Sequence, residues 1–379
     1  MIVKAGQNNK TVFFLGAGFS KDAGGPIQNE ILRNILGDGF KRHYSKQNQI
    51  LKDVDSFKKF LTDDLCLSED QFDHIALEDV FTPIDRCLSQ GTSFRLKSPK
   101  DLIDLREKLH TLMGYSIQYG VSHKNAEYIT KFAKYINSQA KKRLGSEASD
   151  CVSVITTNWD ILLDNELNKL TTTESKAMCG SDQENGPIAV VDYCCYISSL
   201  EDDPFIKPGL LALGRGGYNI KYLKLHGSMN WLHCPACHRL YVKFQEATMF
   251  SKHYCKHCKN NYQYRERTSI QLRGNLILPT FLKDFSNVQM QLIWQNAGIE
   301  LSEASKVVFI GYSLPAADFE IRQLLSRYIR KDAEIEVVLH PGHNTTEEAK
   351  RYRNFFGNRK VSFLRMTVED YIDSVMLKP

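Results

Sequence analysis

The sequence predicts an α/β fold in which helices cover both faces of a parallel sheet. Short runs of β-branched and aromatic residues indicate buried strands, and they lie at residues 11–15, 151–155, 222–225, 274–279, 306–311, 334–340 and 361–364. Helical patterns follow most of these runs. Because strands that alternate with helices form parallel sheets, we expect a Rossmann-like, doubly wound sheet. The segment 171–220 is rich in Gly, Ser, Asp and Pro, and we expect it to be irregular.

The first predicted strand ends in a glycine turn. Gly16, Ala17 and Gly18 follow residues 11–15, and a helical pattern lies further on, at residues 30–36. Backbone N–H groups in such a turn can approach a pyrophosphate, and the N-terminus of a helix adds positive potential. The dinucleotide fingerprint would place a third glycine at position 21, where this chain has Lys21. The turn alone therefore leaves a nucleotide site and a plain tight connection as equal alternatives.

Two segments interrupt the predicted sheet. Residues 37–147 have helical character, because Ser98 and Pro99 are typical of a helix start and apolar residues then recur on one stripe at Leu102, Leu105 and Leu109. We interpret this stripe as packing core. The second segment, 233–267, contains four closely spaced cysteines. The predicted organisation is a core of residues 1–36, 148–232 and 268–379, a helical insertion at 37–147 and a small module at 233–267.

The small module has the pattern of a zinc ribbon. Its cysteines form two C-x-x-C pairs about 17 residues apart, Cys234 with Cys237 and Cys255 with Cys258. Four thiolates at this spacing can surround one Zn²⁺ tetrahedrally. Two disulfides or four free thiols are the alternative, but neither requires the paired spacing. Because four protein ligands leave no open position for water, we expect a structural zinc and not a catalytic one.

The rest of the composition is typical of a globular protein in a reducing compartment. The other six cysteines show no spacing of a disulfide framework, which favours a cytoplasmic location. No apolar run approaches the roughly 18 residues that span a bilayer, and the first apolar run is too short for a signal peptide. The formal net charge of +5 is mild for 379 residues and argues neither for nor against a nucleic-acid partner.

Polar residues follow several predicted strands, at the end of the sheet where open parallel sheets bind ligands. Asn158 and Asp160 come after residues 151–155, His226 after 222–225, and Gly311 and Ser313 at and after the end of 306–311. An imidazole next to a glycine is suited to take a hydroxyl proton, and an asparagine can hold a ribose or a water. A lone histidine is more often structural, and Asn158 or Asp160 could instead cap the next helix. The combination of strand ends with the glycine turn favours a ligand site.

These motifs together resemble the sirtuin family. The glycine turn with Ser20 and Pro26 is similar to the sirtuin phosphate-binding loop, residues 156–160 (Thr-Thr-Asn-Trp-Asp) to the Thr-Gln-Asn-Ile-Asp signature, and residues 226–228 to the catalytic histidine motif. The four cysteines and a Gly-Tyr-Ser loop at 311–313 follow in the same order. The resemblance implies an NAD-binding core with NAD as substrate, a structural zinc, and Asn158 and His226 as catalytic residues. It further implies that NAD contacts Gly16, Ala17, Gly18, Ser20, Pro26, Thr157, Asp160, Gly311 and Ser313.

Two departures from the family pattern shape the functional expectation. Residues 27–29 (Ile-Gln-Asn) replace the Asp-Phe-Arg of protein-deacylating sirtuins, and residues 280–284 (Thr-Phe-Leu-Lys-Asp) replace the segment that pairs with a substrate peptide. Residues 311–318 and the helical insertion instead resemble bacterial sirtuin-like effectors of anti-phage defence, which hydrolyse NAD. By that resemblance we expect an NAD glycohydrolase that depletes NAD in infected cells, as a homo-oligomer in complex with a HerA-like hexameric ATPase.

Two alternative functions stay open. An NAD-dependent protein deacylase would use the same site, with an acyl-lysine oxygen as the attacking group in place of water. A nucleic-acid contact would use the basic and aromatic residues around the cysteines. The basic residues are Arg239, Lys243, Lys252, Lys256, Lys259, Arg265, Arg267 and Arg273, and the aromatic residues are Tyr241, Phe244, Tyr254, Tyr262 and Tyr264. A solvated basic surface is the simpler interpretation of the same residues.

Overall fold

The computed structural model describes residues 9–72, 74–121, 126–146, 149–179, 186–261, 270–341 and 345–377. Contacts within the chain divide it into two compact units. The first unit comprises Met1–Phe19, Ala126–Leu276 and Phe285–Pro379, and the second comprises Ser20–Asn125 and Ile277–Asp284. Both units contain fully buried apolar side chains, such as Phe14 in the first and Phe57 in the second.

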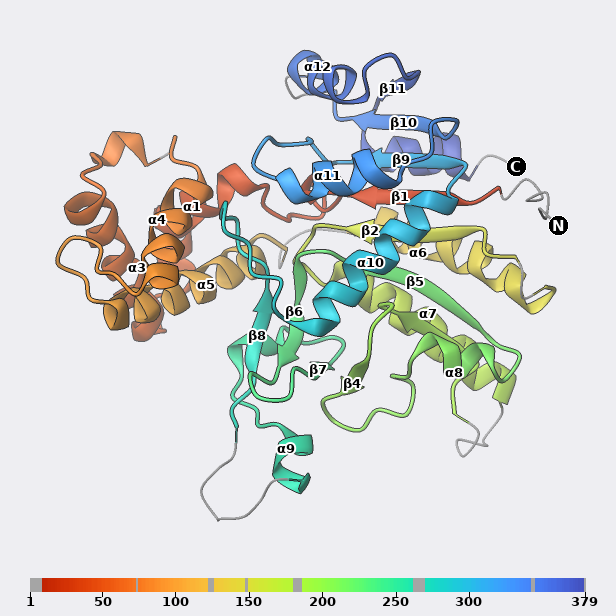
Figure 1. Ribbon diagram of the computed structural model, residues 1–379, viewed down its shortest axis with the longest axis horizontal. Coiled ribbons are helices and arrows are strands. Elements are labelled where there is room, and N and C mark those ends of the chain that lie inside the picture. The colour runs from red at the N-terminus through yellow and green to blue at the C-terminus, as the bar shows by residue number, and fades with distance from the viewer. Residues whose placement is uncertain are drawn as a thin grey trace. The chain divides into compact units, whose positions relative to one another are not determined.

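The first unit is built on a parallel sheet with the strand order β11-β10-β9-β1-β2-β5-β3 (Figure 1). Every neighbouring pair in this sheet is parallel. The strands are β1 Thr11–Leu15, β2 Val152–Thr156, β3 Ala189–Asp192, β5 Tyr218–Lys224, β9 Lys306–Ile310, β10 Glu334–Leu339 and β11 Val361–Arg365. The prediction of a doubly wound parallel sheet is confirmed.

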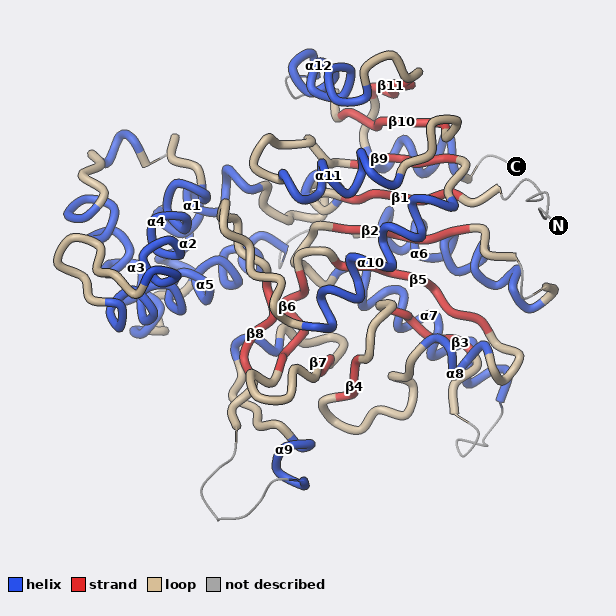
Figure 2. The backbone as a smooth tube through the Cα atoms, viewed as in Figure 1, coloured by secondary structure: helices blue, strands red, loops and turns tan. Residues whose placement is uncertain are grey.

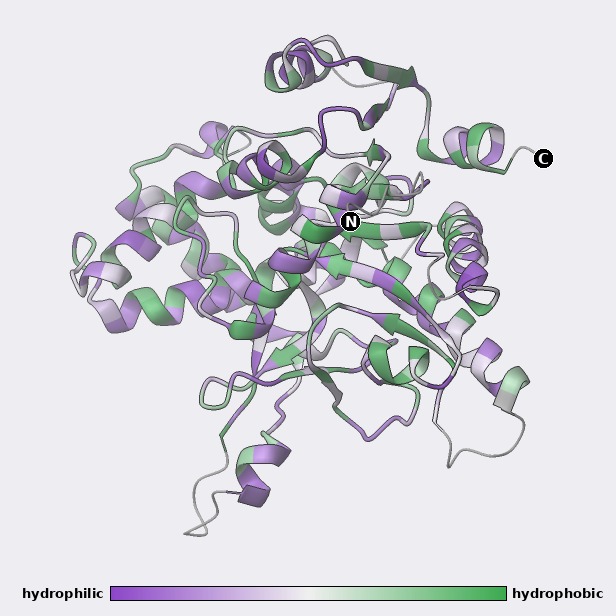
Figure 3. Cartoon of the chain, turned by 45° about the vertical axis from the view of Figure 1, so that its right-hand side comes forward, coloured by the Kyte–Doolittle hydropathy of each residue, from purple (hydrophilic) through white to green (hydrophobic). Residues whose placement is uncertain are grey.

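Helices lie on both faces of this sheet (Figure 2). Adjacent residues of a strand point to opposite faces, so one strand can contact helices on both sides. Phe13 contacts Phe132 with ring centroids 5.4 Å apart. Its neighbour Phe14 contacts Phe309, which in turn contacts Tyr352. Most of the central strands are coloured hydrophobic in Figure 3, as expected for strands buried on both faces. The helices of this unit are α6 Glu127–Ala140, α7 Leu162–Cys179, α8 Gly209–Leu213, α9 Lys256–Asn261, α10 Val288–Glu303, α11 Phe319–Tyr328, α12 Thr345–Phe356 and α13 Val368–Tyr371.

A smaller sheet in the first unit carries the cysteine module. Its strand order is β4-β7-β6-β8, with bounds β4 Ile197–Ser199, β6 Gly227–His233, β7 Leu240–Val242 and β8 Arg273–Leu276. The predicted strand at 274–279 corresponds to β8, and it pairs antiparallel with β6 instead of joining the parallel sheet. Gly227 permits this pairing, because its φ is +75° and a Cβ there would lie 2.0 Å from the main-chain oxygen of Asn275.

The segment 171–220 is more regular than predicted. Within its described residues, α7 runs to Cys179, β3 forms an edge of the parallel sheet, and β4 and α8 follow. The hydroxyl of Ser175 donates to the oxygen of Ala189 and accepts from its N–H, both at 2.9 Å. Short apolar runs become strands here because neighbouring elements supply their hydrogen bonds, a contribution that local composition does not contain.

The second unit is helical. Its helices are α1 Gln28–Leu36, α2 Asp38–His43, α3 Asn48–Lys59, α4 Leu77–Gln90 and α5 Pro99–Val121. The predicted apolar stripe is buried in α5, where Leu102, Leu105 and Leu109 are at most 6% exposed. The Oγ of Ser98 accepts from the N–H of Asp101 at 3.3 Å, as an N-cap does. The predicted insertion at 37–147 overlaps this unit, which also holds α1, whereas α6 belongs to the first unit because it packs against α7 and β5.

Shorter helical turns connect these elements. Within the described ranges they lie at Ala17–Phe19, Phe60–Asp64, Glu69–Gln71, Lys141–Leu144, Thr248–Phe250 and Ile372–Met376. Across the same ranges, every helix lacks either the length or the apolar character that a bilayer crossing needs.

Candidate functional site

The carboxyl ends of β9, β1, β2 and β5 lie side by side at one edge of the parallel sheet. Leu15 pairs with Ile310 on one side and with Thr156 on the other, and Thr156 pairs with Lys224. The ladder continues past β2, because the N–H of Thr157 donates to the oxygen of Leu15 at 3.1 Å. Loops 16–18, 157–160 and 311–313 and the residue at 226 therefore share this edge.

Gly16, Gly18 and Gly311 pack backbone against backbone. The N–H of Gly18 donates to the oxygen of Gly311 at 2.9 Å. A Cβ at Gly16 would lie 2.6 Å from that oxygen, and a Cβ at Gly311, whose φ is +63°, would lie 2.2 Å from the nitrogen of Phe19. Contacts this short with backbone atoms exclude side chains. The packing of the two loops thus requires these glycines, with or without a phosphate.

The glycine turn leads into a 3₁₀ turn, Ala17–Phe19, and not directly into an α-helix. Helix α1 begins at Gln28, in the second unit. Ser20 and Pro26, which were predicted to contact NAD, also belong to the second unit. Ser20 is 3% exposed, and its oxygen accepts from the N–H of Gly25 at 2.8 Å, so this residue closes a turn inside that unit.

Asn158 and His226, the predicted catalytic residues, follow neighbouring strands and are 8% and 7% exposed. The N–H of Asn158 donates to Oγ1 of Thr156 at 3.0 Å, which bends the chain directly after β2. The next residue, Trp159, lies beside His226, with ring centroids 6.5 Å apart and planes tilted by 32°. The oxygen of Trp159 accepts from the N–H of Met229 at 2.9 Å. Both predicted residues thus belong to one junction between loop 157–160 and the start of β6.

Asp160 has the capping role that the sequence left open. Its Oδ1 accepts from the N–H of Leu162 at 3.1 Å, at the first residue of α7. Its main-chain oxygen accepts from Nζ of Lys224 at 2.6 Å. Asp160 therefore joins the start of α7 to the end of β5, and its predicted contact with NAD stays a prediction.

A buried ion pair next to this junction was not predicted from the sequence. Lys224 and Asp164 of α7 are both fully buried, with the ammonium 2.7 Å from Oδ2. The hydroxyls of Tyr193 and Tyr222 donate to the two oxygens of this carboxylate at 2.8 and 3.3 Å. Burial, together with the Asp164 charge, raises the pKa of both phenols well above its ordinary value, so both stay protonated donors. The sequence carries little signal for this pair, because β5 contains two lysines, Lys221 and Lys224, and only Lys224 is fully buried.

Helix α12 holds the loop after β9. The hydroxyl of Tyr352 donates to the oxygen of Tyr312 at 2.6 Å, and Nε of Arg351 donates to the oxygen of Ser313 at 2.9 Å. The hydroxyl of Tyr312 donates to Asp318 at 3.0 Å, which closes the loop on itself. The bonds from Tyr352 and Arg351 use carbonyl oxygens of the loop. The predicted contact of Gly311 and Ser313 with NAD stays a prediction.

The four predicted zinc ligands lie together, with all Sγ atoms within 4.8 Å of one another. The Sγ atoms of Cys234 and Cys258 are 3.7 Å apart, as are those of Cys237 and Cys255. Tetrahedral coordination with Zn–S bonds of about 2.3 Å places sulfurs about 3.8 Å apart, whereas a disulfide would bring them to about 2.05 Å. All four are free thiols in this structure. The geometry therefore fits a four-thiolate zinc site.

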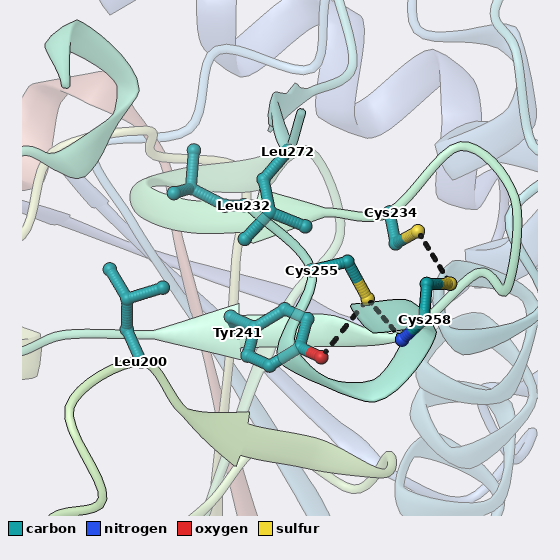
Figure 4. Packing of buried hydrophobic residues seen from close by; sticks show 7 residues of the cluster. All are labelled: Leu200, Leu232, Cys234, Tyr241, Cys255, Cys258 and Leu272. Carbon is teal, nitrogen blue, oxygen red and sulfur yellow. Dashed lines mark hydrogen bonds between the residues drawn. The ribbon is translucent and has the colours of Figure 1, made fainter. Parts of the chain in front are cut away.

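Packing and hydrogen bonds support the cysteine cluster (Figure 4). Sγ of Cys255 lies 3.3 Å from the hydroxyl of Tyr241 and accepts from the N–H of Cys258 at 3.4 Å. Burial alone would raise the pKa of Cys255, but these hydrogen bonds lower it to about 7, whereas burial and the neighbouring thiols raise the pKa of Cys258. The case for a metal therefore rests on the positions of the sulfurs. The surrounding core includes Leu200, Leu232 and Leu272.

The basic residues around the cysteines are partly neutralised by acidic partners. Lys243 lies 2.7 Å from Glu201, and Lys256 lies 2.6 Å from Asp202. Arg239 stacks over an aromatic ring of the same unit, 5.2 Å from its centroid. Four other predicted members, Arg265, Arg267, Tyr262 and Tyr264, lie outside the described residues, and Lys252, Lys259, Arg273 and Tyr254 are exposed. The two ion pairs neutralise only part of this basic surface, and the nucleic-acid contact stays a prediction.

Comparison with known proteins gives a likeness in structure only. No family model and no curated protein matches this chain. Among solved structures, a Sir2 homolog–NAD complex aligns with a TM-score of 0.44 and 13% identity, over 97% of this chain and 88% of that one. Sir2 bound to acetylated peptide aligns with a TM-score of 0.40 and 14% identity, over 97% and 92%. Because both TM-scores lie below 0.5, the fold assignment rests on the sheet topology described above.

Proposed function

We propose that this protein is a sirtuin-like NAD glycohydrolase, which converts NAD and water to nicotinamide, ADP-ribose and a proton. The supporting observation is the shared edge of β9, β1, β2 and β5. The glycine turn, Asn158, His226 and the loop after β9 all follow strands that end there. Open parallel sheets bind nucleotides outside this end of the strands.

The proposed reaction breaks the bond between nicotinamide and ribose. This bond breaks through a transition state with positive charge on the ribose, so the site must stabilise that charge while excluding bulk water. The buried amide of Asn158 is suited to orient the ribose or the attacking water. His226 is suited to take the proton that the water releases as its oxygen bonds to the anomeric carbon.

We base the choice of hydrolysis over protein deacylation on residues 280–284, which depart from the segment that pairs with a substrate peptide in protein-deacylating sirtuins. A peptide substrate that extends a sheet needs free backbone donors and acceptors along the edge it joins. Here the N–H of Phe281 donates to the hydroxyl of Thr82 at 3.2 Å, and the N–H of Leu282 donates to the hydroxyl of Thr280 at 3.2 Å. Two donors of this segment are thus already used within the second unit.

The test is loss of NAD during incubation with the purified chain, alone and with a candidate partner. Asn158→Ala and His226→Ala should each lower the rate by at least about 100-fold, with unchanged circular dichroism and metal content. Nicotinamide release that is accelerated by an acetyl-lysine peptide would support the deacylase instead. Release at the wild-type rate from both variants would exclude the proposed site.

We also propose a cytoplasmic homo-oligomer that acts in anti-phage defence with a HerA-like hexameric ATPase. This part rests on the resemblance of residues 311–318 and of the helical insertion to such effectors. Native mass spectrometry of the complex, combined with NAD turnover on the same sample, tests it. A monomer that is fully active without any partner would contradict it.

The cysteine cluster is proposed to hold one structural zinc. Strand β6, Gly227–His233, joins His226 directly to Cys234 in the chain. Metal analysis should find about one zinc per chain, and Cys258→Ser should lose it. Full zinc content in that variant would show that the ion binds elsewhere.

A further inference from the structure

Lys224 occupies the point where the two candidate catalytic segments meet. It is the last residue of β5, two positions before His226, and it is fully buried. Its ammonium donates to the main-chain oxygen of Asp160, two positions after Asn158, at 2.6 Å. The Lys224 side chain therefore bridges the segment that contains His226 and the segment that contains Asn158.

The bridge is held in place from several directions. Asp164 lies 2.7 Å from the Lys224 ammonium, and the hydroxyls of Tyr193 and Tyr222 fix its two carboxylate oxygens. The ammonium also lies 5.5 Å from the centroid of the Tyr222 ring. Both charges are thus paired and hydrogen-bonded, which is the condition under which buried ions are tolerated.

A second bond acts on the neighbouring carbonyl of the same loop. The N–H of Met229 in β6 donates to the oxygen of Trp159 at 2.9 Å, next to the oxygen that Lys224 holds. The continuous chain from β5 to β6 therefore binds two successive carbonyls of loop 157–160. These carbonyls belong to the two residues that follow Asn158, so holding them restricts the position of the Asn158 backbone from which its side chain extends.

Stability alone does not explain a buried ion pair here. Apolar residues of similar volume often replace such pairs without loss of stability. The neighbouring residues of β5 and of the following turn, Leu223 and Leu225, are buried and apolar. What an apolar residue at 224 would lack is the donor for the oxygen of Asp160.

We propose that Lys224 and Asp164 are positioning residues that fix loop 157–160 against the β5–β6 turn and so set the geometry between Asn158 and His226. The catalytic consequence rests on the proposed NAD hydrolysis, whereas the ordering of the loop does not. Displacements of about 1 Å at a catalytic group can cost roughly 100-fold in rate.

The central variant is Lys224→Met/Asp164→Asn in the full-length, zinc-loaded chain. It removes both charges, keeps an oxygen that accepts from Tyr193, and removes the donor to Asp160. We expect faster hydrogen exchange in residues 156–161 with unchanged exchange in β1. We expect kcat to fall by about 10- to 100-fold while KM changes by less than about threefold.

Two further variants serve as a donor-retaining comparison and as a control. Lys224→Gln/Asp164→Asn retains an N–H donor at position 224, and we expect it to restore part of the loop protection and of kcat. Lys10→Met is the matched control, because Lys10 is also fully buried and precedes β1 at the opposite end of the sheet. It should leave exchange in 156–161 and kcat at wild-type values, whatever its effect on stability.

The outcomes separate the two proposals. Wild-type loop exchange in Lys224→Met/Asp164→Asn, or equal kcat in the Met and Gln double variants, would overturn the positioning role. If the Met double variant does not fold, Lys224→Leu/Asp164→Asn, which also lacks the donor to Asp160, replaces it, and wild-type loop exchange in that variant overturns the role equally. If the wild-type chain consumes no NAD with its partner, the proposed function fails, and loop exchange still decides whether Lys224 orders the loop.

Discussion

The parallel sheet buries one lysine at each end, and the two lysines have different surroundings. Lys10 precedes β1 at the amino end, where its ammonium lies 2.8 Å from carboxylate oxygens of Asp150 and Glu303 and also contacts Glu300. Lys224 ends β5 at the carboxyl end, where it contacts one carboxylate and one main-chain oxygen. Both side chains are 0% exposed.

The difference lies in what each lysine holds. The carboxylates of Asp150, Glu300 and Glu303 approach one another closely enough to resemble a metal site, but the Lys10 ammonium lies among them. Burial lowers the pKa of Lys10, but these charges outweigh burial and raise it above its ordinary value. Both clusters join secondary-structure elements, and the Lys224 cluster joins β5 to α7. The Lys224 cluster in addition holds the main-chain oxygen of Asp160 in loop 157–160. We therefore expect buried charge to stabilise the fold at both ends of the sheet, and to order loop 157–160 at the carboxyl end only.

The largest effect on stability is expected from Lys224→Met alone. The variant leaves the Asp164 carboxylate buried without its cation, and breaking a buried pair in this way costs roughly 3–5 kcal/mol. Urea unfolding followed by circular dichroism measures the change. The double variant Lys224→Met/Asp164→Asn should recover most of the loss. A double variant as unstable as the single one would show that the charges themselves are not the cause.

Lys10→Met should cost less, about 2–4 kcal/mol, because other cations stay near the carboxylates. Lys221 lies 2.6 Å from Asp150 and also contacts Glu300, and Arg143 lies 2.6 Å from Asp150. The same urea experiment compares the two lysines directly. A loss of unfolding free energy larger than that of Lys224→Met would show that the amino-end cluster contributes more to stability.

Asp150→Asn should make the amino-end contribution visible as a pH dependence. Burial raises the pKa of Asp150, but Lys221 and Lys10 outweigh burial and lower it to about 2. A carboxylate with a lowered pKa stabilises the fold above its unfolded-state pKa of about 3.9, and this stabilisation is lost as the pH falls toward 2. The variant should lose on the order of 2 kcal/mol at pH 7. A difference from wild type that does not shrink between pH 4 and about 2 would contradict this assignment.

The smallest effect is expected from Tyr193→Phe at the carboxyl end. It removes a 2.8 Å hydrogen bond to a buried carboxylate, which should cost about 1.5 kcal/mol. Tyr222→Phe is the matched control, because its bond to the same carboxylate is longer, at 3.3 Å. Thermal unfolding of both variants checks the order. Equal losses would mean that the two phenols share the carboxylate evenly.

Much of the fold could be predicted because the signals are local. Apolar runs gave the parallel strands, and the spacing of the cysteines indicated a cluster whose Sγ atoms do lie within 4.8 Å of one another. The strands β3 and β4 were missed, because they have only four and three residues and lie in a segment rich in Gly, Ser, Asp and Pro. The pairing of β8 with β6 was missed, because an apolar run does not indicate which strand it pairs with.

The candidate site was predictable in its parts but not in its connections. The motifs around Asn158 and His226 stand at strand ends, where a general rule places ligands. The link between them depends on Lys224 reaching Asp160 and Asp164, which are about 60 residues away in the chain. A lysine in a strand predicts a solvent-exposed position, so only the three-dimensional arrangement reveals that this one is buried.

The backbone contact among Gly16, Gly18 and Gly311 couples two loops that lie almost 300 residues apart in the chain. Neither loop can accept a side chain at these positions unless the other is rebuilt at the same time. A redesign of the proposed nucleotide site must therefore vary both loops in one library. Libraries that mutate these glycines one at a time will mainly contain variants in which a new side chain clashes with the backbone of the other loop.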